Sequence, residues 1–298
     1  PSRGGSVMRR NLIGWMFLAP AIALIGLFTI TPFAQAILLS FQSWDGISPD
    51  TPPWVGFANY EFVWHYDAFW ASMKNVVVFA AVGFFIGNGV ALLMATAVNR
   101  ITRGKTFFRT VFYLPGVLSV VVVGMLFSSM LNPRSGLINN VLGAVGLESW
   151  QQNWLGDPSL ALPTVAAVFV WFHWGVRLPA VPRRPPGHPE RAVRGREPRR
   201  RPRLGEVPLH HVAAPRAVTT IVSLLTLLAA MQIFGTVQVL TNGGPGYHTM
   251  VPTLLIYGEA FTNYRYGSAA AMSVIFGGGA LVILSLIQLG LSNRRSRA

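Results

Sequence analysis

The chain has 298 residues, of which 52% are hydrophobic and only 11% are charged, and its mean hydropathy is +0.46. About a quarter of the residues in a soluble globular domain are charged, so this composition excludes an ordinary soluble domain and indicates a membrane protein. The sequence contains no cysteine, which excludes disulfides, thiolate metal sites and a cysteine nucleophile.

The net charge of +14 is at first typical of a nucleic-acid-binding protein. Residues 177–216, however, contain eleven arginines and three glutamates and so account for +8 of this total. The remaining +6 is ordinary for a protein that is anchored by basic residues on the cytoplasmic side of a membrane.

In chain order, residues 1–10 are polar and basic and are expected to form a cytoplasmic N-terminus, ahead of a transmembrane region over 11–298. Residues 12–41 carry no charge. Since about twenty apolar residues cross a bilayer, they predict a tilted or overlong span, with Pro20 and Pro32 as possible kinks. Residues 75–98 and 110–131 predict the second and third spans.

The fourth apolar run starts at 161 and is interrupted after 176, so a span is assigned at about 161–182. Residues 218–240 and 268–291 predict the last two spans. Basic clusters lie at both ends, after the second span and within 177–216, whereas acidic residues lie in the other loops. The positive-inside rule therefore predicts an all-α, polytopic protein with six spans and both termini in the cytoplasm.

Residues 177–216 differ from everything around them, because they hold nine of the 21 prolines as well as the eleven arginines. Proline stops helices, and a dense block of like charge repels itself. Taken literally, the stretch is predicted to be a solvated, disordered basic insert on the cytoplasmic side.

Six segments resemble, in order, the inner-membrane permease subunit of binding-protein-dependent ABC importers, in the carbohydrate-importing branch with its MetI-like bundle. The more specific features are Phe107-Phe108-Arg109 with Leu114-Pro115, and the turn Asn242-Gly243-Gly244-Pro245-Gly246 that follows Thr241. The resembling segments are 17–46, 54–63, 103–119, 136–146, 154–171 and 238–246.

The resemblance implies a subunit of an ATP-driven importer for a sugar or related polyol, in the bacterial inner membrane. It also implies as partners a second homologous permease, two cytoplasmic ATPase subunits and an extracytoplasmic solute-binding protein. The chain contains no nucleotide-binding motif, so we expect it to bind no cofactor itself, with ATP used by the ATPase subunits. A permease of this kind is not an enzyme.

The family's cytoplasmic coupling loop, which docks into the ATPase, is expected here at about 190–208. Its pattern is E-A-A, three residues, G, nine residues, then I and P, and it is absent as written. With suitable synonymous codons, however, reading the bases under 181–216 one position later restores every signature letter. We therefore interpret residues 177–216 as the product of two compensating frameshifts, through sequencing error or gene decay.

Three groups are candidates for the transport pathway, and each also has a purely structural interpretation. The glycine-rich turn at 242–246 needs no ligand to explain it. Polar residues within a span usually face the bundle interior, so Thr226, Gln232 and Gln238 either pack helices or line the passage. Trp171 and Trp174 either stack on a sugar ring or anchor the chain at the membrane interface.

A metal site is not expected, because three of the four candidate histidines, His188, His210 and His211, lie inside the anomalous stretch, and only His173 lies outside it. Two alternative functions remain: an importer permease for another solute such as a phosphorylated polyol, or a membrane-anchored basic protein that binds nucleic acid or anionic lipid. The second depends on residues 177–216 alone. We therefore expect the lipid bilayer, but not nucleic acid, among the partners.

Overall fold

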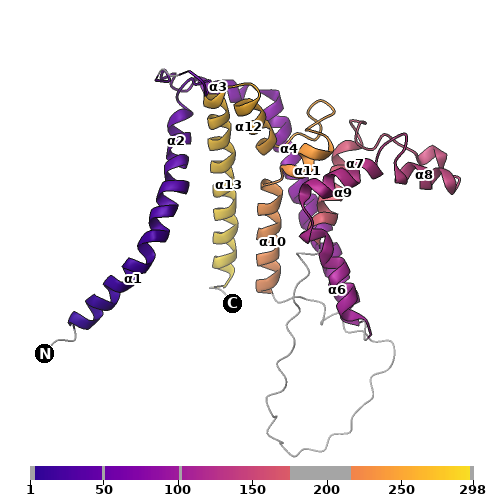
Figure 1. Cartoon of the computed structure of the whole chain (residues 1–298), viewed down its shortest axis with the longest axis horizontal. Coiled ribbons are helices and arrows are strands. Elements are labelled where there is room, and N and C mark those ends of the chain that lie inside the picture. The colour runs from indigo at the N-terminus through magenta and orange to yellow at the C-terminus, as the bar shows by residue number, and fades with distance from the viewer. Residues whose placement is uncertain (1–3, 49–50, 101–102, 175–215, 296–298) are drawn as a thin grey trace, which may run out of the picture. The chain divides into compact units, whose positions relative to one another are not determined.

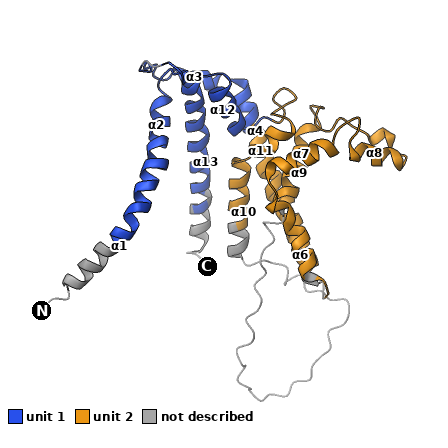
Figure 2. Cartoon of the chain, in the orientation of Figure 1, with its two compact units in different colours: residues 1–73, 250–298 blue, residues 74–249 orange. Residues whose placement is uncertain are grey.

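Helices account for all the regular structure that the computed structural model describes, which covers residues 4–48, 51–100, 103–174 and 216–295. Within these ranges there is no β-strand, only an isolated bridge between Gln42 and Trp54. This confirms the predicted all-α class. The chain divides into two compact units, residues 1–73 with 250–298, and residues 74–249 (Figure 2).

The first unit begins with one long helical run from Gly4 to Leu39. This run comprises α1 (Gly4–Ile25), the π-helix η1 (Gly26–Ile30) and α2 (Thr31–Leu39), with Pro20 inside α1 and Pro32 in the first turn of α2. The unit also contains α3 (Ala58–Trp64), α12 (Pro252–Phe261) and α13 (Tyr266–Arg295). Helices α2, α3 and α12 all pack against α13, and they gather at its N-terminal end (Figure 1).

The core of the first unit joins residues from the two ends of the chain. Its buried members come from α3, the start of α4, α12 and α13: Val63, Ala68, Phe69, Leu255, Ala271 and Met272. In contrast, the described part of the span Trp15–Leu39 is exposed along its length. Its C-terminal part, α2, contacts α13, and the exposed apolar surface of the rest suits contact with lipid.

A close approach at Gly46 secures the loop after α2. Gly46 has a φ of +79°, and a Cβ atom there would collide with the ring of Tyr266, the first residue of α13. The Tyr266 backbone N–H also donates to the Trp44 carbonyl oxygen at 3.0 Å. Only glycine combines a freely adopted positive φ with the absence of a Cβ atom, for which there is no room here.

The second unit begins within α4 (Asp67–Val82), which starts in the first unit. Its remaining elements are η2 (Gly83–Gly87), α5 (Asn88–Arg100), α6 (Lys105–Tyr113), η3 (Leu114–Val117), α7 (Val120–Met130), α8 (Leu137–Ala144), η4 (Glu148–Trp150), α9 (Ala161–Trp174), α10 (Arg216–Met231) and α11 (Gly235–Leu240). Here η2 is a π-helix, whereas η3 and η4 are 3₁₀ helices.

Small residues allow α7 and α11 of the second unit to pack closely. A Cβ atom on Gly124 of α7 would lie 2.6 Å from the Val239 side chain of α11. Glycine at such a contact lets two helices approach with their backbones close together, as is common within membranes.

The predicted spans correspond to helices that differ in continuity. Among the described residues, three helices are long and apolar enough to cross a membrane: Trp15–Leu39, Asp67–Val98 and Tyr266–Leu286. The third predicted span, 110–131, is bent by 97° between Val117 and Val120. The fifth, 218–240, is interrupted between α10 and α11, and the fourth is described only as far as Trp174.

Candidate functional site

The glycine-rich turn that follows α11 depends on left-handed backbone conformations. Asn242, Gly243 and Gly246 have φ values of +49°, +86° and +56°. Glycine adopts these conformations without steric cost, and asparagine tolerates them better than most residues. Local geometry therefore explains why these residue types occupy the turn.

The buried side chain of Thr249 stabilises this turn through hydrogen bonds. Its side chain is fully buried, and its hydroxyl donates to the Gly244 carbonyl oxygen at 2.7 Å. The same hydroxyl lies 2.7 Å from Thr241 Oγ1. Sequence analysis missed Thr249, because a single threonine after a glycine-rich turn gives no distinctive signal.

A second tie joins the segment after the turn to α4. Asn75 is 8% exposed, and its Nδ2 donates to the Tyr247 carbonyl oxygen at 3.0 Å. Both residues belong to the second unit. The 242–249 segment is thus held by side chains that come from outside the turn itself.

A cavity of about 410 Å³ lies beside this turn. Ligand pockets usually measure roughly 300–1,000 Å³ and combine apolar walls with a few polar groups. The walls here fit that description, since their polar side chains are neutral and no charged side chain is among them. The lining residues are Ser128, Leu131, Asn132, Pro133, Leu155, Gly156, Leu240, Thr241, Gly244 and Pro245.

Thr226, one of the predicted pathway residues, lies buried between helices. Its hydroxyl is 2.9 Å from Asn88 Oδ1 and 2.8 Å from the Val222 carbonyl oxygen, and its single O–H is shared between these two acceptors. Asn88 is the first residue of α5, directly after the π-helix η2. In this conformation the hydroxyl serves helix packing.

The other predicted pathway residues do not gather around one cavity. Gln232 is exposed in the break between α10 and α11, and Gln238 is half-buried on α11. Trp171 lines a separate apolar cavity of about 380 Å³, in contact with the Phe127 ring at 5.0 Å. The side chain of Trp174 lies outside the described residues. A pathway role for these residues stays a prediction.

Two loop aspartates act as local turn-formers, one in each unit. Hydrogen bonds from the Ser48 hydroxyl, the Ser48 N–H and the Ile47 N–H lower the pKa of Asp45 to about 2. Bonds from the Ser159 hydroxyl and N–H likewise lower the pKa of Asp157. Both carboxylates therefore stay ionised at neutral pH and stabilise loops.

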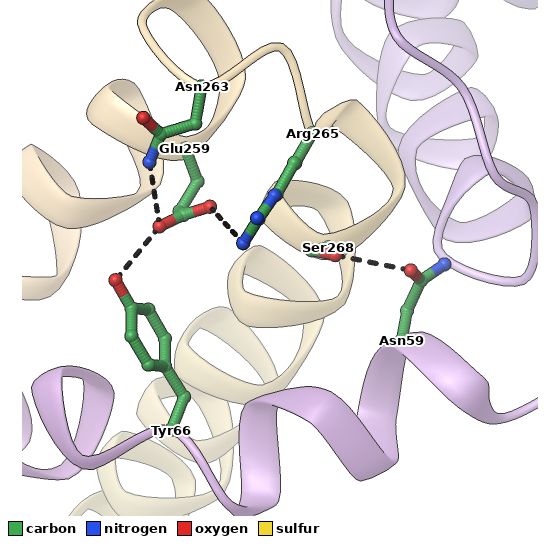
Figure 3. A network of polar contacts seen from close by, with 6 residues as sticks. All are labelled: Asn59, Tyr66, Glu259, Asn263, Arg265 and Ser268. Atoms are coloured by element: carbon green, nitrogen blue, oxygen red, sulfur yellow. Dashed lines mark hydrogen bonds and ion pairs between the residues drawn. The ribbon is translucent and has the colours of Figure 1, made fainter.

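Glu259 is a buried carboxylate at the end of α12, with 1% of its surface exposed (Figure 3). Its Oε1 accepts hydrogen bonds from the Tyr66 hydroxyl and from Asn263 Nδ2, both at 3.0 Å. Its Oε2 accepts no hydrogen bond from the described residues and lies 4.0 Å from Arg265 Nη1. Sequence analysis missed this network, which joins residues 193 positions apart.

The described residues contain no group of three or more histidine, cysteine, aspartate or glutamate side chains that could hold a metal ion. His173 uses its Nδ1 to bond the Phe169 carbonyl oxygen at 2.9 Å. The anomalous stretch 177–216, apart from the start of α10 at Arg216, lies outside the described residues, and so does the predicted coupling loop at 190–208.

Several curated proteins are similar to this chain over most of its length. A probable ABC transporter permease protein, YurN of Bacillus subtilis, is 30% identical over 95% of this chain and 97% of its own. The diacetylchitobiose uptake system permease protein NgcF of Streptomyces coelicolor is 30% identical, covering 97% of this chain and 86% of NgcF. The sn-glycerol-3-phosphate transport system permease protein UgpA of Agrobacterium fabrum is 31% identical, covering 90% and 91%.

The fold is also found among solved structures. A chain of a bacterial alginate ABC transporter, crystallised with an alginate pentasaccharide-bound periplasmic protein, matches with a TM-score of 0.72 and 19% identity. The match covers 96% of each chain. No protein-family model matches the sequence.

Proposed function

Because this chain belongs to the ABC transporter permeases, we propose that it forms part of the passage of an importer for a sugar or related polyol. The observation that carries this proposal is its similarity, along nearly the whole chain, to permeases named for the uptake of diacetylchitobiose and of sn-glycerol-3-phosphate. Both of those solutes are rich in hydroxyl groups. The relatives are transporter permease subunits, so the chain is a membrane-embedded transport protein and not an enzyme.

The proposed importer contains a second homologous permease, two cytoplasmic ATPase subunits and an extracytoplasmic solute-binding protein. ATP binding closes the ATPase pair, the motion passes to the permeases through their coupling loops, and the passage opens outward to receive the solute. We place the chain in the bacterial inner membrane with both termini in the cytoplasm, on the basis of its charge asymmetry.

A neutral solute suits the cavity beside the 242–249 segment better than a phosphorylated one. Its polar lining consists of neutral side chains such as Ser128, Asn132 and Thr241, with aliphatic and proline walls. A phosphate group is usually bound through cationic side chains or several backbone N–H groups. The glycerol-phosphate relatives keep a phosphorylated polyol as the second candidate.

An uptake assay tests the proposal. The chain would be expressed with the partner permease, the ATPase and the solute-binding protein, both as written and with residues 181–216 restored to the alternative frame. Diacetylchitobiose, maltose and sn-glycerol 3-phosphate would be supplied as labelled solutes. We expect the restored importer to accumulate a neutral sugar when ATP is present. Absence of ATP-dependent uptake of every solute in the restored importer would contradict the proposal.

The same experiment compares the chain as written with the restored chain, and so tests the frameshift interpretation of residues 177–216. The chain as written has nine prolines and eleven arginines there and no coupling pattern, so we expect it to purify without the ATPase, whereas the restored chain purifies with it. Equal co-purification and equal uptake by the two versions would show that the frameshift interpretation is wrong.

The pathway residues are tested in the restored importer. If Gln232 contacts the solute during passage, Gln232→Leu lowers uptake while the amount of importer in the membrane stays the same. Gln152→Leu, which replaces an exposed glutamine outside the spans, is the matched control. Normal uptake by Gln232→Leu would show that Gln232 is not part of the transport pathway.

A further inference from the structure

The corner between α12 and α13 holds a tyrosine in an unusual conformation. Tyr264 has a φ of +53°, and its side chain is 51% exposed. A bulky residue in the left-handed region is a genuine outlier, and it persists only where the surrounding structure imposes it. Nothing in the tyrosine side chain itself favours this conformation, so the cause must lie in its neighbours.

Glu259 imposes the conformation from both sides of Tyr264. Its carboxylate holds the Asn263 side chain, and its backbone carbonyl oxygen accepts the Arg265 N–H at 2.8 Å. The carboxylate is in turn fixed by Tyr66, which precedes α4 (Figure 3). Glu259 thus holds the residue before Tyr264 through its carboxylate and the residue after Tyr264 through its backbone carbonyl oxygen.

The same carboxylate orients Arg265. Arg265 Nη1 lies 4.0 Å from Glu259 Oε2, and the guanidinium carbon lies 5.6 Å from the centre of the Phe62 ring. The arginine side chain nevertheless remains 58% exposed. Because a guanidinium has five N–H donors in a planar fork, this one is held on one side and presents donors to solvent on the other.

Exposed aromatic side chains accompany Tyr264 and Arg265. Tyr257 and Phe261 on α12 are 43% and 57% exposed, and their rings lie 5.0 Å apart. Aromatic residues and arginine are enriched at protein interfaces and among the residues that dominate binding energy. Rigid side chains bind well because little entropy is lost when the complex forms.

We infer that this corner, formed by Tyr257, Phe261, Tyr264 and Arg265, is a docking point for an acidic surface of the extracytoplasmic solute-binding protein. The inference rests on the proposed function, which supplies that partner and places the corner outside the membrane. The half-exposed guanidinium specifies an acidic group opposite it. The rigid geometry favours a folded protein over lipid headgroups, because a fluid headgroup layer requires no fixed position of Tyr264.

The test measures how tightly the solute-binding protein used in the uptake assay binds the full chain with its partner permease in nanodiscs. We expect Arg265→Glu to weaken binding about tenfold at low salt, with a smaller loss at high salt, because close charges across an interface attract and salt screens them. Tyr264→Gly should weaken binding about fivefold through loss of the aromatic anchor. Arg134→Glu, at an exposed arginine of the second unit, should change it less than about twofold.

Tyr264→Gly separates docking from folding, because glycine adopts a positive φ freely and should leave the chain at least as stable. Unchanged binding by both corner variants would overturn the inference, as would an equal loss in Arg134→Glu. A loss seen only in nanodiscs of anionic lipid would also overturn it and assign the corner to the membrane surface. If the corner variants lose binding but the importer restored at residues 181–216 takes up no solute, the docking point stands and the proposed function fails.

Discussion

Two turns, one in each unit, hold left-handed residues in place by different chemistry. The turn at 242–246 is closed by hydroxyl groups, with Thr249 bonded to Gly244 and Thr241. The α12–α13 corner around Tyr264 is closed by the buried carboxylate of Glu259. The first turn uses residues that accept its geometry, whereas the second forces a tyrosine into it. The turn at 242–246 is closed by hydrogen bonds between neutral groups, whereas the corner at Tyr264 is closed by hydrogen bonds to a buried carboxylate.

Loss of the carboxylate should have the largest effect on stability. Glu259→Ala leaves Tyr66 and Asn263 without an acceptor and Arg265 without its charge partner. We expect the free energy of unfolding to fall by about 3 kcal/mol, because the Tyr66 hydroxyl and the Asn263 amide each lose a hydrogen bond to the carboxylate. Chemical unfolding of the purified chain in mixed micelles measures this.

Glu61→Ala, at an exposed glutamate of α3, is the control and should change the free energy of unfolding by less than about 0.5 kcal/mol. Equal losses in the two variants would show that Glu259 does not support the corner.

Loss of the Thr249 hydroxyl should cost less, because a hydrogen bond between neutral groups contributes less to stability than hydrogen bonds to a carboxylate. Thr249→Val keeps the side-chain shape but deprives the Gly244 carbonyl oxygen of its donor. We expect a loss of about 1.5 kcal/mol in the same unfolding assay. Thr262→Val, at an exposed threonine in the other turn, should be nearly neutral. If Thr249→Val lowered the free energy of unfolding as much as Glu259→Ala, the proposed difference between the hydroxyl-bonded turn and the carboxylate-bonded corner would be wrong.

The two turns also differ in how far sequence reveals them. Asparagine and glycine at 242–246 are residues that positive φ requires, so the turn was predictable. Tyr264 carries no turn signal, because its conformation is imposed by Glu259, and Glu259 depends on Tyr66 from a distant part of the chain. The sequence therefore predicts a conformation that the turn residues themselves prefer, but not one that depends on contacts with residues far away in the chain.

The same distinction applies to the helices. Uncharged runs predicted where helices form, because apolar content and length are local properties. The 97° bend inside 110–131 was not predicted, although Pro115 and Gly116 lie in η3, directly before it. Beyond the bend, α7 packs against α11 at Gly124, and that contact joins separate parts of the second unit. Likewise, Thr226 could be chosen as a polar residue in a span, but its partner Asn88 could not.

Replacing either of two glycines by alanine should change the free energy of unfolding by a smaller amount, and with opposite signs at the two positions. Gly243→Ala places a side chain where φ is +86° and should destabilise the chain by about 1 kcal/mol. Gly258→Ala, inside α12 with open space around the new methyl group, should stabilise it by up to about 1 kcal/mol. Chemical unfolding of the two variants in parallel measures the difference. A stabilising Gly243→Ala would contradict the left-handed geometry of the turn.

The smallest effect concerns the loop aspartates, one in each unit. Hydrogen bonds from Ser48 and Ile47 hold the pKa of Asp45 at about 2, below its usual 3.8. Because the folded-state pKa is the lower one, the stabilising contribution of Asp45 is fully present above the unfolded pKa and is lost as pH falls through about 2.

Ser48→Ala removes the hydrogen bond that lowers the pKa of Asp45 most, so this pKa should rise toward 3.8. NMR titration of the Asp45 carboxyl carbon measures the midpoint, and Asp157 in the same sample is the internal control, since Ser159 lowers its pKa independently. A midpoint for Asp45 that does not move in Ser48→Ala, or one that moves together with that of Asp157, would show that the Ser48 hydroxyl does not set this pKa.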